Sequence, residues 1–167
     1  MTRLLHVPER VSLALHAAAI LANDPSRPLS TRDIARRMKV SEAHLSKVLQ
    51  RLGRTGLLRS VRGPKGGYLL TKRPSAVTLL EIYQDIEGRL DGAPCLFGEP
   101  VCGGGRCILG DALPAITRIL RDRLSRTHLS DVVSVFAQSS PAPSRGAARN
   151  PISNIRPRRS RRRKGGS

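Results

Sequence analysis

Apolar residues recur with a helical period between Ser41 and Gly53, and the other predicted elements are described relative to this stretch. The apolar positions are Leu45, Val48, Leu49 and Leu52. Their spacing of three and four residues predicts an amphipathic helix with Ser41 as its N-cap. The remaining face carries donors and cations suited to base edges and phosphates, namely Glu42, His44, Ser46, Lys47, Gln50, Arg51 and Arg54.

The pattern changes after Gly56 to two short apolar runs, Leu57-Leu58 and residues 68–70. The segment between them, residues 59–67, is basic and rich in glycine, and it contains Pro64. Glycine and proline at these positions predict a β-hairpin with a basic tip.

A shorter helix is predicted before this unit. Ser30 or Thr31 can cap it, and its apolar side is formed by Ile34, Ala35 and Met38. Two helices separated by a tight turn predict a helix-turn-helix, in which the second helix enters the major groove of DNA. With the hairpin, the unit becomes a winged helix, and Arg62 is well placed to reach the adjacent minor groove.

The amino-terminal apolar run is predicted to be the first core helix. One helical face carries Val11, Leu15, Ala18, Ala19 and Ala22. A secretory signal is the alternative, but Glu9 and Arg10 directly precede the run and His16 interrupts it. No other apolar run approaches membrane-spanning length, so we expect a cytoplasmic protein without a membrane partner.

Two further helices are predicted after the hairpin. Thr78 and Glu81 have the spacing of a capping box, and Gly88 closes the helix that they begin. Asp111 is the predicted N-cap of a longer helix with an apolar stripe at Leu113, Ile116, Leu120 and Leu124. A short turn from Leu129 to Val133 follows. So long a stripe at the end of a small domain indicates a dimerisation helix.

The predicted fold class is therefore mainly α with a small β-hairpin wing. Residues 1–90 form the winged helix-turn-helix domain, and residues 91–110 form a cysteine loop. Residues 111–136 carry the dimerisation helix, and residues 137–167 form a disordered basic tail. In a homodimer, the second helix of each helix-turn-helix would lie about one DNA turn, ~34 Å, from its counterpart on a palindromic operator.

The charge of the chain favours a polyanionic partner. Its 167 residues include 30 Lys and Arg against 12 Asp and Glu, a formal net charge of +18. Double-stranded DNA is the partner that this charge and the helix-turn-helix favour. Nine of the basic residues lie after Ala137 among Pro, Ser and Gly. This tail either is merely solvated or adds affinity for DNA.

Three cysteines lie within thirteen residues, at Cys95, Cys102 and Cys107. An odd number of thiols without a convincing signal peptide argues against a disulfide framework. Thiolates are soft ligands for iron–sulfur clusters or zinc, although the spacing is not that of a typical structural zinc site. Three free thiols and a metal-free thiol–disulfide switch remain as alternatives.

The combination of these segments resembles the IscR and NsrR family of winged-helix iron–sulfur regulators. The matching segments are RVSLALHAAAIL, DIARRMKVSEAHLSKVLQRLGRTGLLRSVRGPKGGYLL, TLLEIYQDIEG and CLFGEPVCGGGRC. The resemblance implies a homodimeric DNA-binding transcriptional regulator that senses redox state, nitric oxide or cluster supply. It also implies a [2Fe-2S] or [4Fe-4S] cluster on the three cysteines.

The fourth cluster ligand is where the chain departs from this family. Relatives with a histidine ligand carry it at the position of Gly110, and other relatives recruit an acid from the first helix of the partner subunit. Ser12 aligns with that acid, so Glu9 or His6 is the candidate fourth ligand, although either can simply be a solvated side chain.

The DNA-contacting residues are predicted from the helix and the wing. They are Ser41, His44, Ser46, Lys47, Arg51, Arg59, Arg62 and Lys65. The resemblance gives Arg62 the role of the minor-groove arginine, and it places Ser46 where the cluster-assembly regulator has a glutamate that affects its choice of sites. No paired carboxylates, catalytic triad or phosphate-binding loop in its proper context indicates an enzyme.

Overall fold

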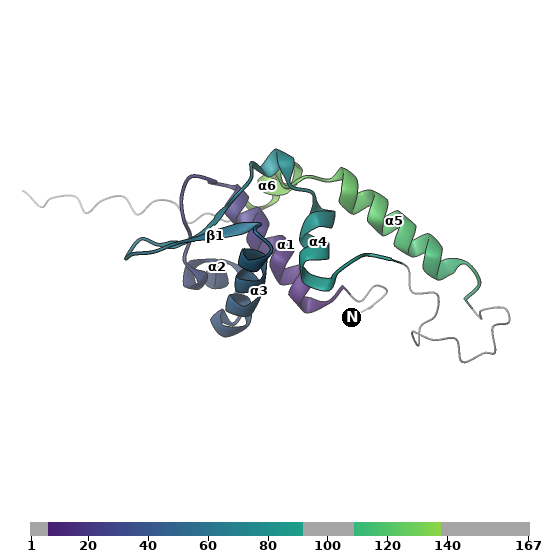
Figure 1. The fold of residues 1–167 in the computed structure, drawn as a ribbon, viewed down its shortest axis with the longest axis horizontal. Helices are drawn as coiled ribbons and strands as arrows, with labels where there is room; N and C mark the ends of the chain where they lie inside the picture. Colours follow the sequence, from purple (N-terminus) through teal and green to yellow (C-terminus); the bar gives the residue numbers. More distant parts are fainter. Residues whose placement is uncertain (1–6, 92–108, 138–167) are drawn as a thin grey trace, which may run out of the picture.

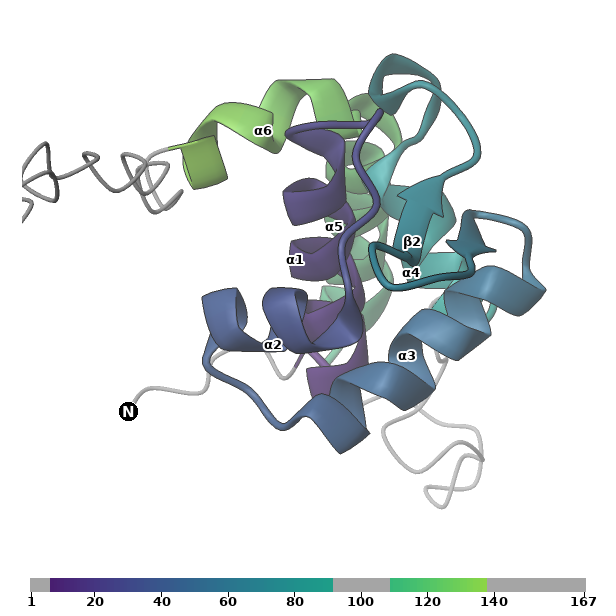
Figure 2. The ribbon, with the colours of Figure 1, turned by 90° about the vertical axis from the view of Figure 1, so that its left-hand side faces the viewer.

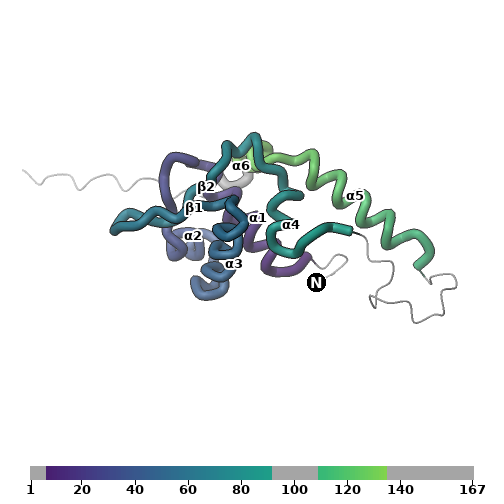
Figure 3. The backbone as a smooth tube through the Cα atoms, viewed as in Figure 1, coloured from purple at the N-terminus to yellow at the C-terminus, as the bar shows by residue number. Residues whose placement is uncertain are grey.

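The computed structural model describes residues 7–91 and 109–137 of the chain. Within these residues a helical core carries a two-stranded wing, and the wing and α5 project from opposite sides of the core (Figures 1 and 3). The elements in chain order are α1 (Glu9–Ala22), α2 (Thr31–Met38), α3 (Glu42–Arg54), β1 (Leu58–Val61), β2 (Gly67–Leu70), the 3-10 turn η1 (Pro74–Ala76), α4 (Leu79–Glu87), α5 (Ala112–Arg126) and α6 (Leu129–Ala137). The predicted winged helix-turn-helix is confirmed.

Helix α1 lies at the centre of the core. It contacts α2, α3, α4, α6 and β2, and Figure 2 shows α6 across one end of it with α2 and α3 towards the other. The prediction of a single apolar face was incomplete, because Leu13, Ala17 and Leu21 are also buried while Leu15 is only half-buried. Elements pack around most of the circumference of α1, and its many alanines let their backbones approach closely.

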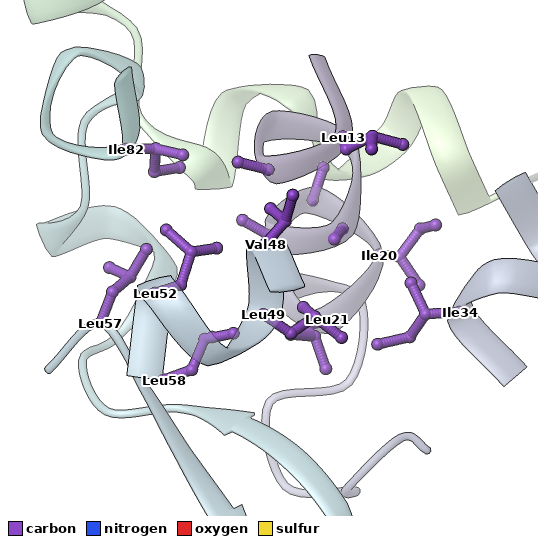
Figure 4. Packing of buried hydrophobic residues seen from close by; sticks show 14 of the residues in the cluster. Leu13, Ile20, Leu21, Ile34, Val48, Leu49, Leu52, Leu57, Leu58 and Ile82 are labelled. Carbon is purple, nitrogen blue, oxygen red and sulfur yellow. The ribbon is translucent and has the colours of Figure 1, made fainter. Parts of the chain in front are cut away.

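The core is filled by aliphatic side chains from several elements. Leu21 of α1, Ile34 of α2 and Leu49 of α3 are at most 1% exposed. Figure 4 shows them converging with side chains from β1 and α4. Full burial of each such side chain contributes about 2 kcal/mol, so apolar packing holds the helix-turn-helix against α1.

The helix-turn-helix has the caps that the sequence predicts. Ser30 Oγ accepts a hydrogen bond from the Asp33 amide at 3.1 Å and donates one to Asp33 Oδ2 at 2.7 Å. Lys39 ends α2 in the left-handed conformation, with φ of 56°. Ser41 Oγ accepts from the His44 amide at 3.5 Å, and α3 continues one residue beyond Gly53.

The wing is an antiparallel hairpin in which Leu58 pairs with Leu70 and Val61 with Gly67. Both strands differ slightly from the prediction, since Leu57 precedes β1 and β2 begins at Gly67. The wing is also tied to the loop before α2, because Leu29 and Tyr68 exchange backbone hydrogen bonds of 3.2 and 2.9 Å. A Cβ atom on Gly67 would lie 2.2 Å from the Leu29 carbonyl oxygen, so this position requires glycine.

Helix α4 begins with half of the predicted capping box. Thr78 Oγ1 accepts from the Glu81 amide at 3.1 Å, but the Glu81 carboxylate contacts Lys72 Nζ at 2.6 Å, where it forms an ion pair. Gly88, with φ of 86°, ends the helix as predicted.

Two helices lie within residues 109–137, the described part of the carboxyl-terminal region. Thr127 is extended, which interrupts the helical path, and the Leu129 amide donates to the Val77 carbonyl at 2.9 Å. Leu129 is fully buried, and α6 is a nine-residue helix packed on α1 rather than the expected short turn. The predicted N-cap at Asp111 was wrong in one respect, because its side chain makes no capping hydrogen bond.

Replacing Gly67 by alanine should destabilise the protein. The new methyl group would meet the Leu29 backbone, so either the wing or the loop before α2 must move. We expect Gly67→Ala to lower the free energy of unfolding in urea by about 2 kcal/mol.

Gly53→Ala is the matched control for this change. Gly53 lies within α3, and the nearest atom to its added Cβ is the Leu58 oxygen at 4.0 Å. This variant should be neutral or gain up to ~1 kcal/mol from helix propensity. Equal effects of the two substitutions would contradict the close approach at Gly67.

Candidate nucleic-acid interface and the flank of the cysteine segment

The apolar stripe of α3 packs into the core, and the opposite face of the helix is exposed. Leu45 and Leu49 are fully buried, whereas Lys47, Gln50 and Arg54 are exposed at a spacing of three and four residues. Figure 2 shows α3 on the outside of the molecule beside α2. Among the described residues, no acid forms an ion pair with Lys47 or Arg54.

One flank of α3 is anchored to neighbouring helices. His44 Nδ1 lies 3.6 Å from Glu9 Oε1 of α1, and Arg51 Nε donates to the Asp85 carbonyl of α4 at 2.7 Å. Both His44 and Arg51 are predicted DNA contacts, and both remain exposed. Arg51 therefore uses part of its hydrogen-bonding capacity within the protein, which the sequence pattern did not predict.

The opposite flank of α3 faces the wing across an open groove of about 500 Å³. Gln50 Nε2 donates to Ser46 Oγ at 3.2 Å on this flank. The groove is lined by Gln50, Gly53, Arg54, Leu58, Arg59, Ser60 and Tyr68. It therefore joins the second half of α3 to the strand that carries the predicted contact Arg59.

The wing carries exposed cations at Arg59, Arg62 and Lys65, as predicted. Its turn is closed by a hydrogen bond from the Gly66 amide to the Gly63 carbonyl at 2.9 Å. A second groove, of about 550 Å³, lies between this turn and the loop before α2, where Arg27 and Lys65 both line it. Arg27 was not a predicted contact. It lies near the wing because Leu29 pairs with Tyr68, and the local sequence does not indicate that pairing.

Helix α2 adds positive charge that is partly offset. Arg32 lies 3.6 Å from Glu42, and Arg36 lies 3.7 Å from Asp33. All four side chains are at least half exposed, so these pairs contribute little to stability. The candidate interface, defined as the exposed polar residues of α3 together with Arg59, Arg62 and Lys65, lies beside this helix.

The end of α4 is bound both to α3 and to α1. Thr55 Oγ1 donates to Asp85 Oδ2 at 2.9 Å, next to the contact between Arg51 and the Asp85 backbone. Partial burial raises the pKa of the Asp85 carboxyl, and the Thr55 hydrogen bond opposes that shift. Arg10 of α1 makes a two-pronged ion pair with Glu87.

Arg121 links α5 to the residues that follow α4, where the predicted cysteine loop begins. Its Nη2 atom donates to the Leu90 carbonyl and to Asp91 Oδ1, both at 2.5 Å. The guanidinium holds the pKa of Asp91 below its usual range, so any stability from this contact is lost as pH falls through that lowered value. Leu90 and Asp91 therefore lie beside α5, the helix that follows the predicted cysteine loop in the chain.

The predicted cluster ligands lie mostly outside the described residues. Cys95, Cys102, Cys107 and His6 belong to the parts of the chain that the structure does not describe. Glu9 is described and exposed, and it lies beside His44. Within residues 7–91 and 109–137 no three His, Cys, Asp or Glu side chains gather as a metal site.

The apolar stripe of α5 is partly covered in the single chain, and two isoleucines on one side of it are exposed. Ile116 and Ile119 are 47% and 67% exposed, and only Leu124 of this helix is buried. No helix among the described residues has the length and apolar character needed to cross a membrane.

The curated relatives that the chain matches are transcriptional regulators. The chain is 36% identical over 98 residues to the HTH-type transcriptional regulator IscR of Photorhabdus laumondii, which covers 59% of this chain and 57% of the relative. It is 35% identical over 107 residues to IscR of Escherichia coli, which covers 64% and 63%. The match thus spans about three fifths of each curated relative, and these relatives are transcriptional regulators rather than enzymes.

Solved structures share the fold. CymR, the global cysteine regulator of B. subtilis, superimposes with a TM-score of 0.66 at 27% identity and covers 79% of this chain and 98% of its own. IscR of T. potens superimposes with a TM-score of 0.64 at 22% identity, covering 83% and 93%. The family model for Rrf2, described as an iron-dependent transcriptional regulator, matches residues 7–135. The chain therefore belongs to the Rrf2 family.

Proposed function

We propose that this chain is a homodimeric, sequence-specific DNA-binding transcriptional regulator. The observation that carries the proposal is the exposed basic face of α3 beside a wing with Arg59, Arg62 and Lys65. In this fold the second helix reads base edges in the major groove, and a wing cation contacts the neighbouring minor groove or backbone. Membership of the Rrf2 family supports the same function.

Homodimerisation through α5 is the second part of the proposal. Ile116 and Ile119 form an uncovered apolar strip on a helix whose other positions include Arg118 and Arg123. A second copy would bury this strip and hold two α3 helices about one DNA turn apart, ~34 Å, on a palindromic operator.

An iron–sulfur cluster on Cys95, Cys102 and Cys107 is the third part. Three thiolates within thirteen residues fit the ligand preference of a [2Fe-2S] or [4Fe-4S] cluster, and Glu9 or His6 would complete the set. When bound, the cluster would supply a group that reacts with oxidants or nitric oxide.

The flank of α3 offers a route from the cysteines to the DNA. Asp91, which Arg121 holds, lies four residues before Cys95, and the end of α4 contacts Arg51 and Thr55. A change at the cysteines would bias the position of α4 and hence of α3. Such a change alters DNA affinity only by its differential effect on the two states.

A regulator of the same fold with a metal-free thiol switch, or with no sensor, is the alternative. The observation in its favour is the set of three cysteines, which is one ligand short of either cluster. Metal and sulfide analysis of the purified protein separates the two functions.

Arg62→Ala should weaken binding to the operator by about 5- to 150-fold. The loss of a cation at the wing removes a minor-groove or backbone contact, and it should also reduce the slope of log affinity against log salt by about one. Fluorescence anisotropy with duplex DNA at several salt concentrations measures both quantities.

Arg73→Ala is the control for the wing variant. Arg73 precedes η1, which contacts α6 on the side of the core away from α3 in Figure 1, and it is exposed. Its removal lowers the net charge equally but should leave affinity within about twofold. Equal losses in both variants would mean that net charge alone, and not the wing, attracts DNA.

Ile119→Asp should shift the protein from dimer to monomer. A carboxylate in the middle of an apolar contact is costly to bury, whereas it is well solvated on a free helix. Light scattering coupled to size-exclusion chromatography gives the mass, and Ser125→Asp is the control, because it introduces the same charge at an exposed position on a different side of the same helix. A wild-type monomer at micromolar concentration would contradict dimerisation through α5.

Anaerobic reconstitution with iron and sulfide should give visible absorption from sulfur-to-iron charge transfer. Cys102→Ala should abolish this absorption, because two thiolates cannot hold the cluster stably. Melting curves of the variant and the wild type without metal check that the fold is unchanged. A colourless wild-type protein after reconstitution would leave the metal-free alternative.

A further inference from the structure

The carboxamide of Gln50 forms a hydrogen bond with its own helix on the exposed face of α3. Gln50 lies one turn after Ser46, and its Nε2 atom donates to Ser46 Oγ at 3.2 Å. Gln50 is exposed, whereas Ser46 is half-buried, so the hydroxyl is the better fixed of the two groups. A long polar side chain on a helix surface otherwise samples several rotamers, and this hydrogen bond restricts them.

The restricted carboxamide retains a matched donor and acceptor. One Nε2 hydrogen is used by Ser46, which leaves the second hydrogen and the Oε1 lone pairs unused within the described residues. Adenine presents an acceptor, N7, beside a donor, N6-H, at its major-groove edge. A carboxamide with one free donor and one free acceptor pairs with both, and with guanine it would oppose its acceptor to another acceptor.

The position of Gln50 favours a base contact over a structural role. On the other flank, Arg51 donates a hydrogen bond to the Asp85 carbonyl, and His44 lies 3.6 Å from the Glu9 carboxylate. Gln50 is instead on the wing-facing flank, at the open groove that also includes Arg54 and Arg59. The two cations that line the same groove suit the phosphates that border a major groove.

We propose that Gln50 is a base-reading residue that selects adenine at one position of each half-site, with Ser46 as its positioning residue. The proposal rests on the DNA-binding function proposed above and adds a specificity determinant to it. Arg54 and Arg59 bind the sugar–phosphate backbone beside that base pair.

The test is selection of duplexes from a randomised pool, followed by affinity measurements, with the full-length wild type and three variants. Gln50→Ala should lose the preference at a single adenine position per half-site and bind the best wild-type site about 5- to 150-fold more weakly. It should bind the duplex altered at that position as well as the wild type does. Ser46→Ala should weaken the preference at the same position by a smaller factor.

Arg54→Ala is the matched control, since it lies on the same face of α3 one turn after Gln50. It should weaken all duplexes by a similar factor and reduce the salt slope by about one, with no change of preferred sequence. Circular dichroism and thermal melting establish that each variant is folded before its sites are compared.

Two results would overturn the inference. If Gln50→Ala selects the wild-type sequences with affinity unchanged or uniformly lowered, Gln50 does not read a base and only this inference fails. If the wild type selects no sequence from the pool in either its metal-loaded or its metal-free form, the proposed function fails as well.

Discussion

The burial of α1 on most of its circumference is the constraint on which the other elements depend. Its alanines leave room for α3, α4 and β2 to pack against it, and α6 packs against it as well. Each large aliphatic side chain that becomes fully buried contributes about 2 kcal/mol, whereas an exposed ion pair contributes about 0–1 kcal/mol. Apolar packing on α1 therefore fixes the angle of α3. The ion pair between Arg10 and Glu87 helps to orient α4 against α1 but contributes little to stability.

The same packing gives the two flanks of α3 different roles. Towards α1 and α4, the Arg51 side chain is hydrogen-bonded to the Asp85 carbonyl, and His44 lies near Glu9. Towards the wing, the Gln50 side chain is hydrogen-bonded to its own helix neighbour Ser46 and faces an open groove. A helix anchored along one side can present the other side at a fixed angle, which is the property that base recognition needs.

The residues at the end of α4 and directly after it contact three other helices. Asp85 is bound to α3, Glu87 to α1, and Asp91 to α5, so seven consecutive residues touch three other helices. In the proposed function the cysteines follow this stretch directly. A small displacement there would reach α3 through two hydrogen bonds and a packed core, because close-packed interiors transmit strain.

The sequence by itself determined the elements of local origin. Helical spacing of apolar residues predicted α2, α3 and α4 to within about a residue, and the caps at Ser30, Ser41 and Thr78 follow from side chains that reach only three residues ahead. The glycines of the wing predicted a hairpin for the same local reason, and the resemblance of several segments together indicated the family.

Only the tertiary structure decided which residues pack against, or hydrogen-bond to, residues far away in the sequence. The near-complete burial of α1, the requirement for glycine at position 67 and the contact between Arg51 and Asp85 all arise from residues far apart in the chain. The break at Thr127 likewise depends on pairing with the strand-like segment at Val77 and Thr78. Periodicity identifies the face that a helix buries, but it cannot identify the neighbour, because packing is set by the whole core.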